Sequence, residues 1–195
     1  MEQYEIIKKQ LYHYSYLGIR ESHLGATLIG KAPHIAPEAW LNNLYSTINA
    51  KEIEELEQSL GVQIPFSYKC FLNSFSNGLN VMADSLYLYG KRSNFCRNNI
   101  EFVWQPYDIV TINKFEKPKN ASKEMFFIGG YNWDGSRLYM LPDQTVHYCR
   151  RYDATSLLSW DSLSTMLREE IERLYSLFDY NGIQINETHP TIPVY

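Results

Sequence analysis

Four glutamates in one short segment are the first candidates for acid–base chemistry. They are Glu52, Glu54, Glu55 and Glu57. Paired carboxylates work as acid and base only when burial or close approach separates their pKa values. On an exposed helix near its N-terminus, such groups are instead solvated charges that the helix dipole stabilises. We therefore predict that Glu54 and Glu55 face solvent, where they are candidates for contact with a partner protein.

The other residue types that could catalyse a reaction or bind a metal lack the spacing these roles require. They are His13, His23, His34, His147, His189, Cys70, Cys96 and Cys149. No His-x-x-x-His, Glu-x-x-His or Cys-x-x-Cys spacing occurs, and there is no Gly-x-Ser-x-Gly elbow or phosphate-binding loop. The sequence therefore predicts no catalytic residue, no metal ligand and no cofactor.

A tryptophan in a predicted turn is a candidate for binding. Asp134 and Gly135 form a strong turn dipeptide between two apolar runs, which favours a β-hairpin. Tryptophan and tyrosine are enriched in the residues that dominate binding energy at protein interfaces. We therefore predict that Tyr131, Trp133 and Asp134 contact a partner. The alternative for Trp133 is that its ring folds back over the sheet.

Residues 52–78 predict two consecutive helices that pack on the rest of the chain. Asn49 and Glu52 fit a capping box, and Gly61 suits the left-handed position that ends a helix. Pro65 suits the first position of the second helix, and Asn77 with Gly78 then turns the chain. The expected buried residues are Ile53, Leu56, Leu60, Tyr68, Phe71, Leu72 and Phe75.

Hydrophobic periodicity and turn residues predict the remaining elements. Helices are expected from the N-terminus to Gly18, from Pro37 to Ile48, and over 51–60, 66–76 and 160–179, the last with a Glu169–Arg173 ion pair. Strands are expected over 26–29, 84–90, 100–112, 125–131, 136–141 and 145–149, with a polar loop at 113–124. This order indicates an α+β fold with a mostly antiparallel central sheet and helices packed on it.

The helix pair and the elements after it resemble the SUKH superfamily. That family includes a fungal cell-wall-assembly regulator and bacterial immunity proteins that neutralise polymorphic toxins. The matching residues are Ile53, Glu57, Leu60-Gly61, Ile64-Pro65, Tyr68, Phe71-Leu72 and Asn77-Gly78, followed by similar segments at 86–90, 125–141 and 160–163. Glu57 matches the family glutamate, so we expect it to make a structural hydrogen bond, with a partner contact as the alternative.

The resemblance divides the chain into a family core at 50–179, an N-terminal helical extension at 1–48 and a tail at 180–195. No convincing linker separates these parts, and 195 residues suit one domain. We therefore predict a single SUKH-like domain.

Composition narrows the class of partner and the location. The formal net charge is −4 and no long basic run occurs, which argues against nucleic acid as the partner. There is no secretory signal and no apolar run long enough to span a bilayer, so we expect a cytoplasmic protein that does not contact membranes.

The resemblance implies an intracellular immunity protein that neutralises a cognate toxin domain by stoichiometric binding and catalyses nothing. The net charge of −4 weakly favours a basic partner. Two alternatives stay open: an intracellular regulatory or scaffold protein of the cell-wall-regulator type, and an enzyme with an unrecognised site.

Overall fold

The computed structural model describes residues 2–93 and 103–193, and in these residues nine strands form one antiparallel sheet in sequence order. The strands are β1 (Ile19–Glu21), β2 (Thr27–Lys31), β3 (Trp40–Leu44), β4 (Leu79–Val81), β5 (Leu86–Leu88), β6 (Phe126–Tyr131), β7 (Arg137–Met140), β8 (Val146–Arg150) and β9 (Asp153–Trp160). The helices are α1 (Glu2–Leu11), the 3-10 helix η1 (Tyr12–Leu17), α2 (Ala50–Leu60), α3 (Phe66–Ser74), α4 (Ile109–Phe115) and α5 (Leu163–Tyr175). The predicted α+β fold with an antiparallel sheet is confirmed.

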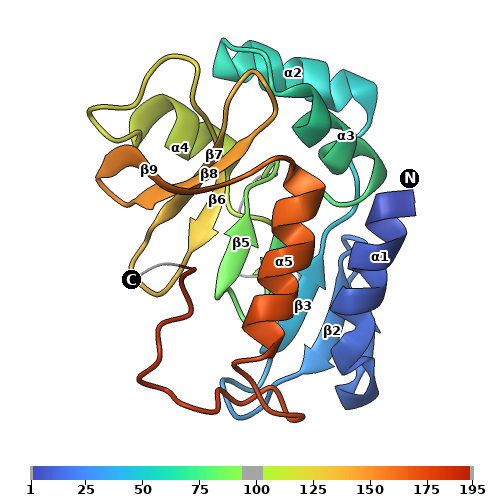
Figure 1. Cartoon of the computed structure of the whole chain (residues 1–195). Helices are drawn as coiled ribbons and strands as arrows, with labels where there is room; N and C mark the ends of the chain where they lie inside the picture. The colour runs from blue at the N-terminus through green and yellow to red at the C-terminus, as the bar shows by residue number, and fades with distance from the viewer. Residues whose placement is uncertain (1, 94–102, 194–195) are drawn as a thin grey trace.

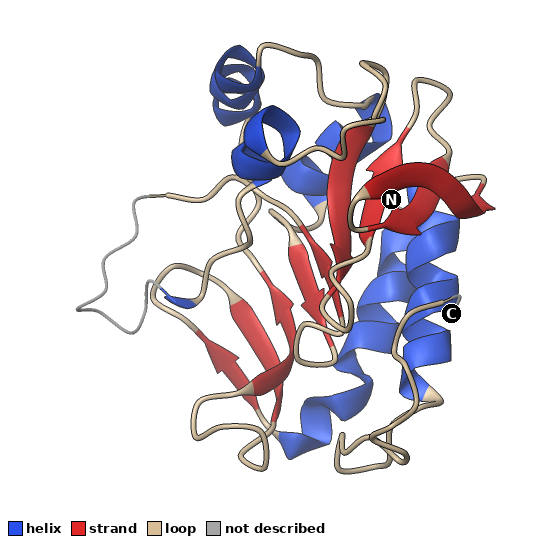
Figure 2. Cartoon of the chain, turned by 90° about the vertical axis from the view of Figure 1, so that its left-hand side faces the viewer, coloured by secondary structure: helices blue, strands red, loops and turns tan. Residues whose placement is uncertain are grey.

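Helices pack on both faces of the sheet, and one face is covered more completely than the other (Figures 1 and 2). The long helices α1 and α5 lie side by side against one face, which we call the inner face. On the other face, which we call the outer face, α4 covers β6 to β9. The segment 103–107 lies over β2 and β3 on this same outer face, away from α1 and α5.

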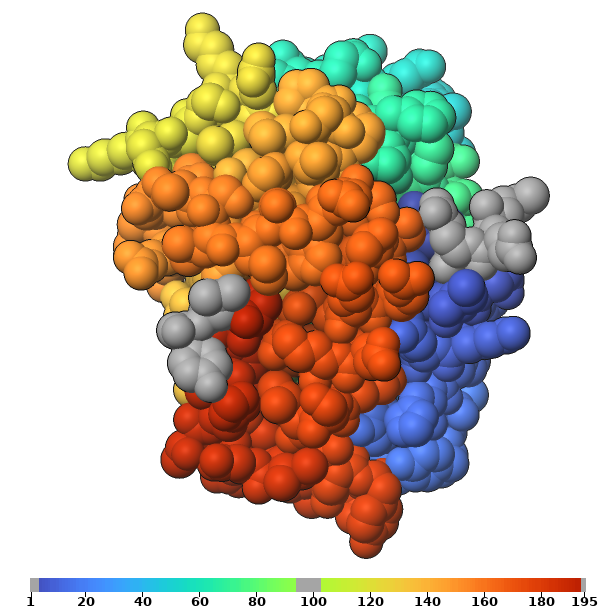
Figure 3. Space-filling model, viewed as in Figure 1, coloured from blue at the N-terminus to red at the C-terminus, as the bar shows by residue number. Residues whose placement is uncertain are grey.

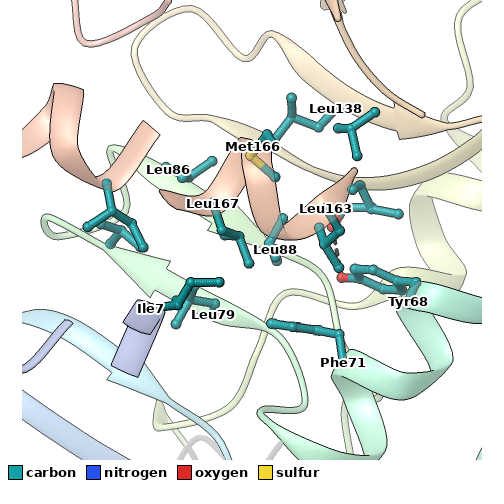
Figure 4. Close-up of a cluster of buried hydrophobic side chains, with 14 of the residues drawn as sticks. Ile7, Tyr68, Phe71, Leu79, Leu86, Leu88, Leu138, Leu163, Met166 and Leu167 are labelled. Atoms are coloured by element: carbon teal, nitrogen blue, oxygen red, sulfur yellow. Dashed lines mark hydrogen bonds between the residues drawn. The ribbon is translucent and has the colours of Figure 1, made fainter. Parts of the chain in front are cut away.

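The main core lies between the inner face and the helices (Figure 4). Ile7 of α1, Phe71 of α3 and Leu167 of α5 meet there with strand residues such as Leu79 and Leu88. Burying such side chains contributes about 1.5–3 kcal/mol each. This contact with three helices fixes the inner face of the sheet.

Local sequence rules explain the α2–α3 pair. Asn49 accepts a hydrogen bond from the Glu52 amide, and the Glu52 side chain accepts one from the Asn49 amide, both at 3.0 Å. Gly61 ends α2 with φ of 72°, in the left-handed region. The predicted capping box and glycine stop are therefore confirmed. Pro65 is the N-cap of α3, one position before the predicted one.

The predicted helix over 37–48 is wrong, because residues 40–44 form the strand β3. Leu41 and Leu44 pack into the main core, whereas Trp40 and Tyr45 pack on the outer face. A strand that is buried on both faces lacks the alternation of apolar and polar residues that marks a strand in sequence. The predicted N-terminal helix is confirmed as α1, but strands β1 to β3 follow it.

The predicted strand over 100–112 is also wrong in the part of it that lies within the described residues. Residues 100–102 lie outside the described residues, and 109–115 form α4 instead. Asp108 caps α4 by accepting hydrogen bonds from the amides of Val110 and Thr111, at 3.3 and 2.9 Å. Asn113 then bonds both backbone groups of Phe127, so the cap and the contact with β6 outweigh the β propensity of the branched residues.

The final helix is shorter than predicted. Trp160 ends β9, an unpredicted edge strand, and α5 begins at Leu163 after the Ser162 cap. The expected Glu169–Arg173 pair is absent from the described ion pairs, because Arg173 turns toward the buried Glu170 at 2.7 Å. The tail after α5 lies directly against that helix in the space-filling view (Figure 3), with Thr191 and Ile192 buried.

Candidate functional site

The acidic helix α2 presents two of its glutamates to solvent. Glu54 and Glu55 are exposed, as expected. Glu55 pairs with Lys91 at 3.2 Å, and Glu52 lies 3.5 Å from the same ammonium group. Exposed pairs of this kind contribute at most about 1 kcal/mol and leave the carboxylates accessible. This face of α2 therefore offers negative charge to an approaching surface.

Glu57 belongs to the structure of the helix pair and not to that exposed face. Its Oε1 accepts a hydrogen bond from the Ile64 amide at 2.8 Å and pairs with Lys69 Nζ at 3.0 Å. These contacts join the end of α2 to the start of α3. Glu57 thus makes the structural hydrogen bond that the sequence predicted.

The turn between β6 and β7 displays a tryptophan on a rigid backbone. Trp133 keeps 45% of its surface exposed, so its ring is not folded fully onto the sheet. Asp134 Oδ1 accepts a hydrogen bond from the Ser136 amide at 2.8 Å, and Gly135 takes the left-handed conformation. Asp134 therefore positions the turn that carries Trp133. Its own side chain is also exposed, and it directly follows Trp133 in the sequence.

Tyr131 is not available to a partner, which corrects the prediction made for it. It is fully buried on the inner face, and its hydroxyl donates to Glu170 Oε2 at 2.7 Å. Burial and the Glu170 carboxylate raise the pKa of this tyrosine well above its usual value. Because side chains alternate across a strand, Tyr131 at the end of β6 points into the core while the turn after it is exposed.

The structure does not bring the two candidate surfaces together. The β6–β7 turn follows the end of β6 that points away from α2 (Figure 1). Trp133 therefore lies on a different part of the surface from Glu54 and Glu55.

Sequence reasoning missed a third group of residues, which line a hollow on the outer face. We call it the outer hollow and define it by Trp40, Asn43, Asn80, Asp84 and Trp104. Its walls come from β3, β4, the β4–β5 turn and the segment 103–107. The sequence did not indicate this hollow, because residues 37–48 were predicted to form a helix and not the strand β3. The available signal was the concentration of tryptophan and asparagine in Trp40–Asn43.

Metal binding and membrane insertion are two further possible functions. In the described residues, no three or more histidine, cysteine, aspartate or glutamate side chains are grouped to bind a metal ion; Cys96 lies outside them. None of the helices in that same part of the chain is both long and apolar enough to cross a membrane.

Comparison with known families shows the family of the chain. The model of the SMI1 / KNR4 family (SUKH-1) matches residues 47–169, which is more than half of the 195-residue chain. The chain belongs to the SMI1 / KNR4 family. The predicted SUKH resemblance is thus confirmed. No curated protein and no solved structure matches the chain.

The SMI1 / KNR4 region includes some of the candidate residues and omits others. It covers α2, the β6–β7 turn and most of α5, and so contains Glu54, Glu55 and Trp133. It begins after β3, so Trp40 and Asn43 of the outer hollow lie outside the region that the family shares.

Proposed function

We propose that this protein is a cytoplasmic immunity protein that binds a cognate toxin domain stoichiometrically and thereby neutralises it. The observation that carries the proposal is membership of the SMI1 / KNR4 (SUKH-1) family, whose members bind protein partners. Two exposed features support a binding role: the tryptophan of the β6–β7 turn and the acidic face of α2.

Neutralisation by binding requires a complementary surface that blocks the toxin, and it requires no chemistry from the immunity protein. Trp133 is a large, exposed aromatic on a fixed turn, which is the type of residue that dominates binding energy. Glu54 and Glu55 add negative charge that would accelerate the approach of a basic partner.

The deciding experiment is co-expression with the toxin domain encoded beside this gene, followed by co-purification and a toxicity assay. A 1:1 complex and restored growth are the expected results. Failure to bind any neighbouring gene product, or turnover of a small-molecule substrate by the purified protein, would contradict the proposal.

Replacing Trp133 by alanine is expected to weaken the complex by roughly 5- to 30-fold, because an interface tryptophan contributes about 1–2 kcal/mol or more. The melting temperature should barely change, because the ring is half-exposed. Calorimetric titration measures the first effect and a thermal melt the second. The matched control is Phe115→Ala, which removes an exposed ring at the end of α4. Equal affinities for Trp133→Ala and wild type would remove the turn from the interface.

Reversing the charge at Glu54 and Glu55 is expected to slow association, because electrostatic attraction acts mainly on the encounter rate. Stopped-flow association rates of Glu54→Lys/Glu55→Lys should fall several-fold at about 10 mM salt and converge with wild type near 1 M, where charges are screened within about 3 Å. Glu172→Lys/Glu187→Lys, which reverses two exposed glutamates of α5 and the tail, is the control for the same change in net charge. A salt-independent deficit would argue against steering by α2.

A further inference from the structure

The outer hollow is a cavity with both polar and apolar walls, on a part of the sheet that α1 and α5 do not cover. Asn42 of β3 points inward, where its Nδ2 donates to Leu11 of α1 and Tyr175 of α5. Its neighbour Asn43 faces the outer side and lies opposite Asn80 of β4. The cavity between them and the segment 103–107 has a volume of about 360 Å³, enough for a side chain and part of its backbone.

Four buried polar atoms, all in residues that line this hollow, have no hydrogen-bond partner among the described residues. They are Nε1 of Trp40 and Trp104 and Oδ1 of Asn43 and Asn80. These residues are only 7–8% exposed. Six such side-chain atoms occur in the described part of the chain, so four of them gather in one place. Each unsatisfied group costs about 1–3 kcal/mol of stability. A ligand that forms hydrogen bonds with these atoms would remove that cost.

Backbone strain marks the same place. Met82, Ala83 and Asp84 in the β4–β5 turn have φ of 49°, 50° and 70°, a region that side-chain-bearing residues rarely adopt. The turn is held by hydrogen bonds from the Ala83 amide to Leu41 O at 2.8 Å and from the Met82 amide to Asn42 Oδ1 at 3.1 Å. Strain of this kind persists where a site needs a particular geometry.

The strained turn places Asp84, which carries a carboxylate, in the lining of the hollow. Asp84 accepts hydrogen bonds from Asn80 Nδ2 and, at 3.0 Å, from the Tyr107 hydroxyl. Burial raises the pKa of Asp84 above its usual value. The Arg92 guanidinium also lines the hollow, so both signs of charge are present.

The unpaired atoms define the chemistry of a ligand that would fit the hollow. Two indole N–H groups need acceptors, and two amide oxygens need donors. A cation would leave the indoles unsatisfied, and an anion would leave the amide oxygens unsatisfied and meet Asp84. A carboxamide satisfies both sets, because it carries one acceptor oxygen and two N–H donors on a planar group that stacks on aromatic rings.

The rim indicates that the group is presented by a polypeptide. Ile35, Val103 and Tyr107 are exposed apolar residues around the polar floor. An apolar ring that excludes water from a few central polar contacts is typical of the energetic centre of a protein interface.

We propose that the outer hollow binds an asparagine or glutamine side chain of the partner protein. This inference rests on the proposed function and adds a contact surface to it. Two of the five residues that define the hollow, Trp40 and Asn43, lie outside the region that the family shares, so the contact belongs to this chain and its own partner.

The test removes the two unpaired donors without emptying the hollow. Trp40→Phe and Trp104→Phe keep a six-membered aromatic ring and remove the indole N–H together with the rest of the five-membered ring. Each substitution should weaken the complex with the neighbouring toxin domain by roughly 2- to 10-fold, and the pair together by tenfold or more. The smaller ring costs packing, and the loss of an unsatisfied buried donor offsets part of that cost, so the melting temperature should fall only modestly.

The matched control is Trp160→Phe, which alters a buried tryptophan of β9 outside the hollow. Wild-type affinity in the Trp40→Phe/Trp104→Phe double variant would overturn the inference while the proposed function stands. Absence of any complex with the wild-type protein would instead overturn the proposed function.

A second measurement tests the ligand class on the free protein. Tryptophan fluorescence is recorded while acetylglutamine N-methylamide, acetylarginine N-methylamide or glucose is added, so that only the glutamine probe carries a primary carboxamide. A saturable change with the glutamine probe is expected. Because the double variant lacks the two reporting rings, its binding of this probe is measured by calorimetric titration and should be lost. A saturable response only to the arginine probe, a response only to glucose, or no response to any probe would overturn the assignment to a carboxamide.

Discussion

The Gly78→Val protein is expected to lose at least about 3 kcal/mol of unfolding free energy, which combines left-handed strain with overpacking. Gly78 has φ of +87°, and a Cβ there would lie 2.7 Å from Pro106 Cβ and 2.8 Å from Leu88 O. Both neighbours are fixed, since Leu88 belongs to β5 and the segment of Pro106 is bonded to Gly90 through Tyr107. Denaturant unfolding measured by circular dichroism gives the loss.

Gly61→Val is the matched control for the contact component. Gly61 has φ of +72°, so it carries similar backbone strain, but a Cβ there would have no atom within 4 Å. We expect a loss of about 1–2 kcal/mol. If the two variants lose equal free energy, the close approach of Pro106 contributes nothing. If neither loses any, the turn assignments at both glycines are wrong.

The Arg173→Met protein is expected to lose about 3 kcal/mol, because it leaves the buried Glu170 without its ion-pair partner. Arg173 Nη2 lies 2.7 Å from Glu170 Oε2 and donates to Thr191 O at 2.7 Å. Since Arg173 is partly exposed, the loss should fall at the low end of the range for broken buried pairs. Chemical denaturation provides the measurement.

A double variant separates the ion pair from packing. Glu170→Leu/Arg173→Met should be more stable than Arg173→Met alone, because no buried charge remains unpaired. Arg168→Met is the control, since Arg168 and Glu169 form an exposed pair at 3.8 Å, and its loss should stay within about 0.5 kcal/mol. A double variant no more stable than Arg173→Met would mean that Glu170 is not the source of the loss.

The β6–β7 turn and the outer hollow, which are both proposed contact surfaces, can be tested independently. Trp133 lies on the β6–β7 turn, whereas the outer hollow is built on β3, β4 and the segment 103–107. Substitutions at one surface share no contacts with those at the other, so their effects on affinity should add. A partner that contacts only one surface would respond to only one set of variants.

The sequence by itself determined the elements whose causes are local. The α2–α3 pair follows from contacts between near neighbours: the Asn49–Glu52 capping box, the left-handed Gly61, and the hydrogen bond from Ile64 to Glu57. Each of these spans at most seven residues, so the residue types and their spacing contain the information. The antiparallel hairpins of β6 to β8 were predictable for the same reason, because turn residues join neighbouring strands.

Only the tertiary structure decided the elements and sites that depend on distant partners. Residues 40–44 are a strand because layers on both faces bury them, and β9 is a strand because it pairs with β8. Tyr131 is buried in the main core and bonds to a glutamate 39 residues away. The outer hollow assembles Trp40, Asn80 and Trp104 from three separate segments. Local periodicity does not determine which faces become buried, because burial is set when the sheet closes against its helices.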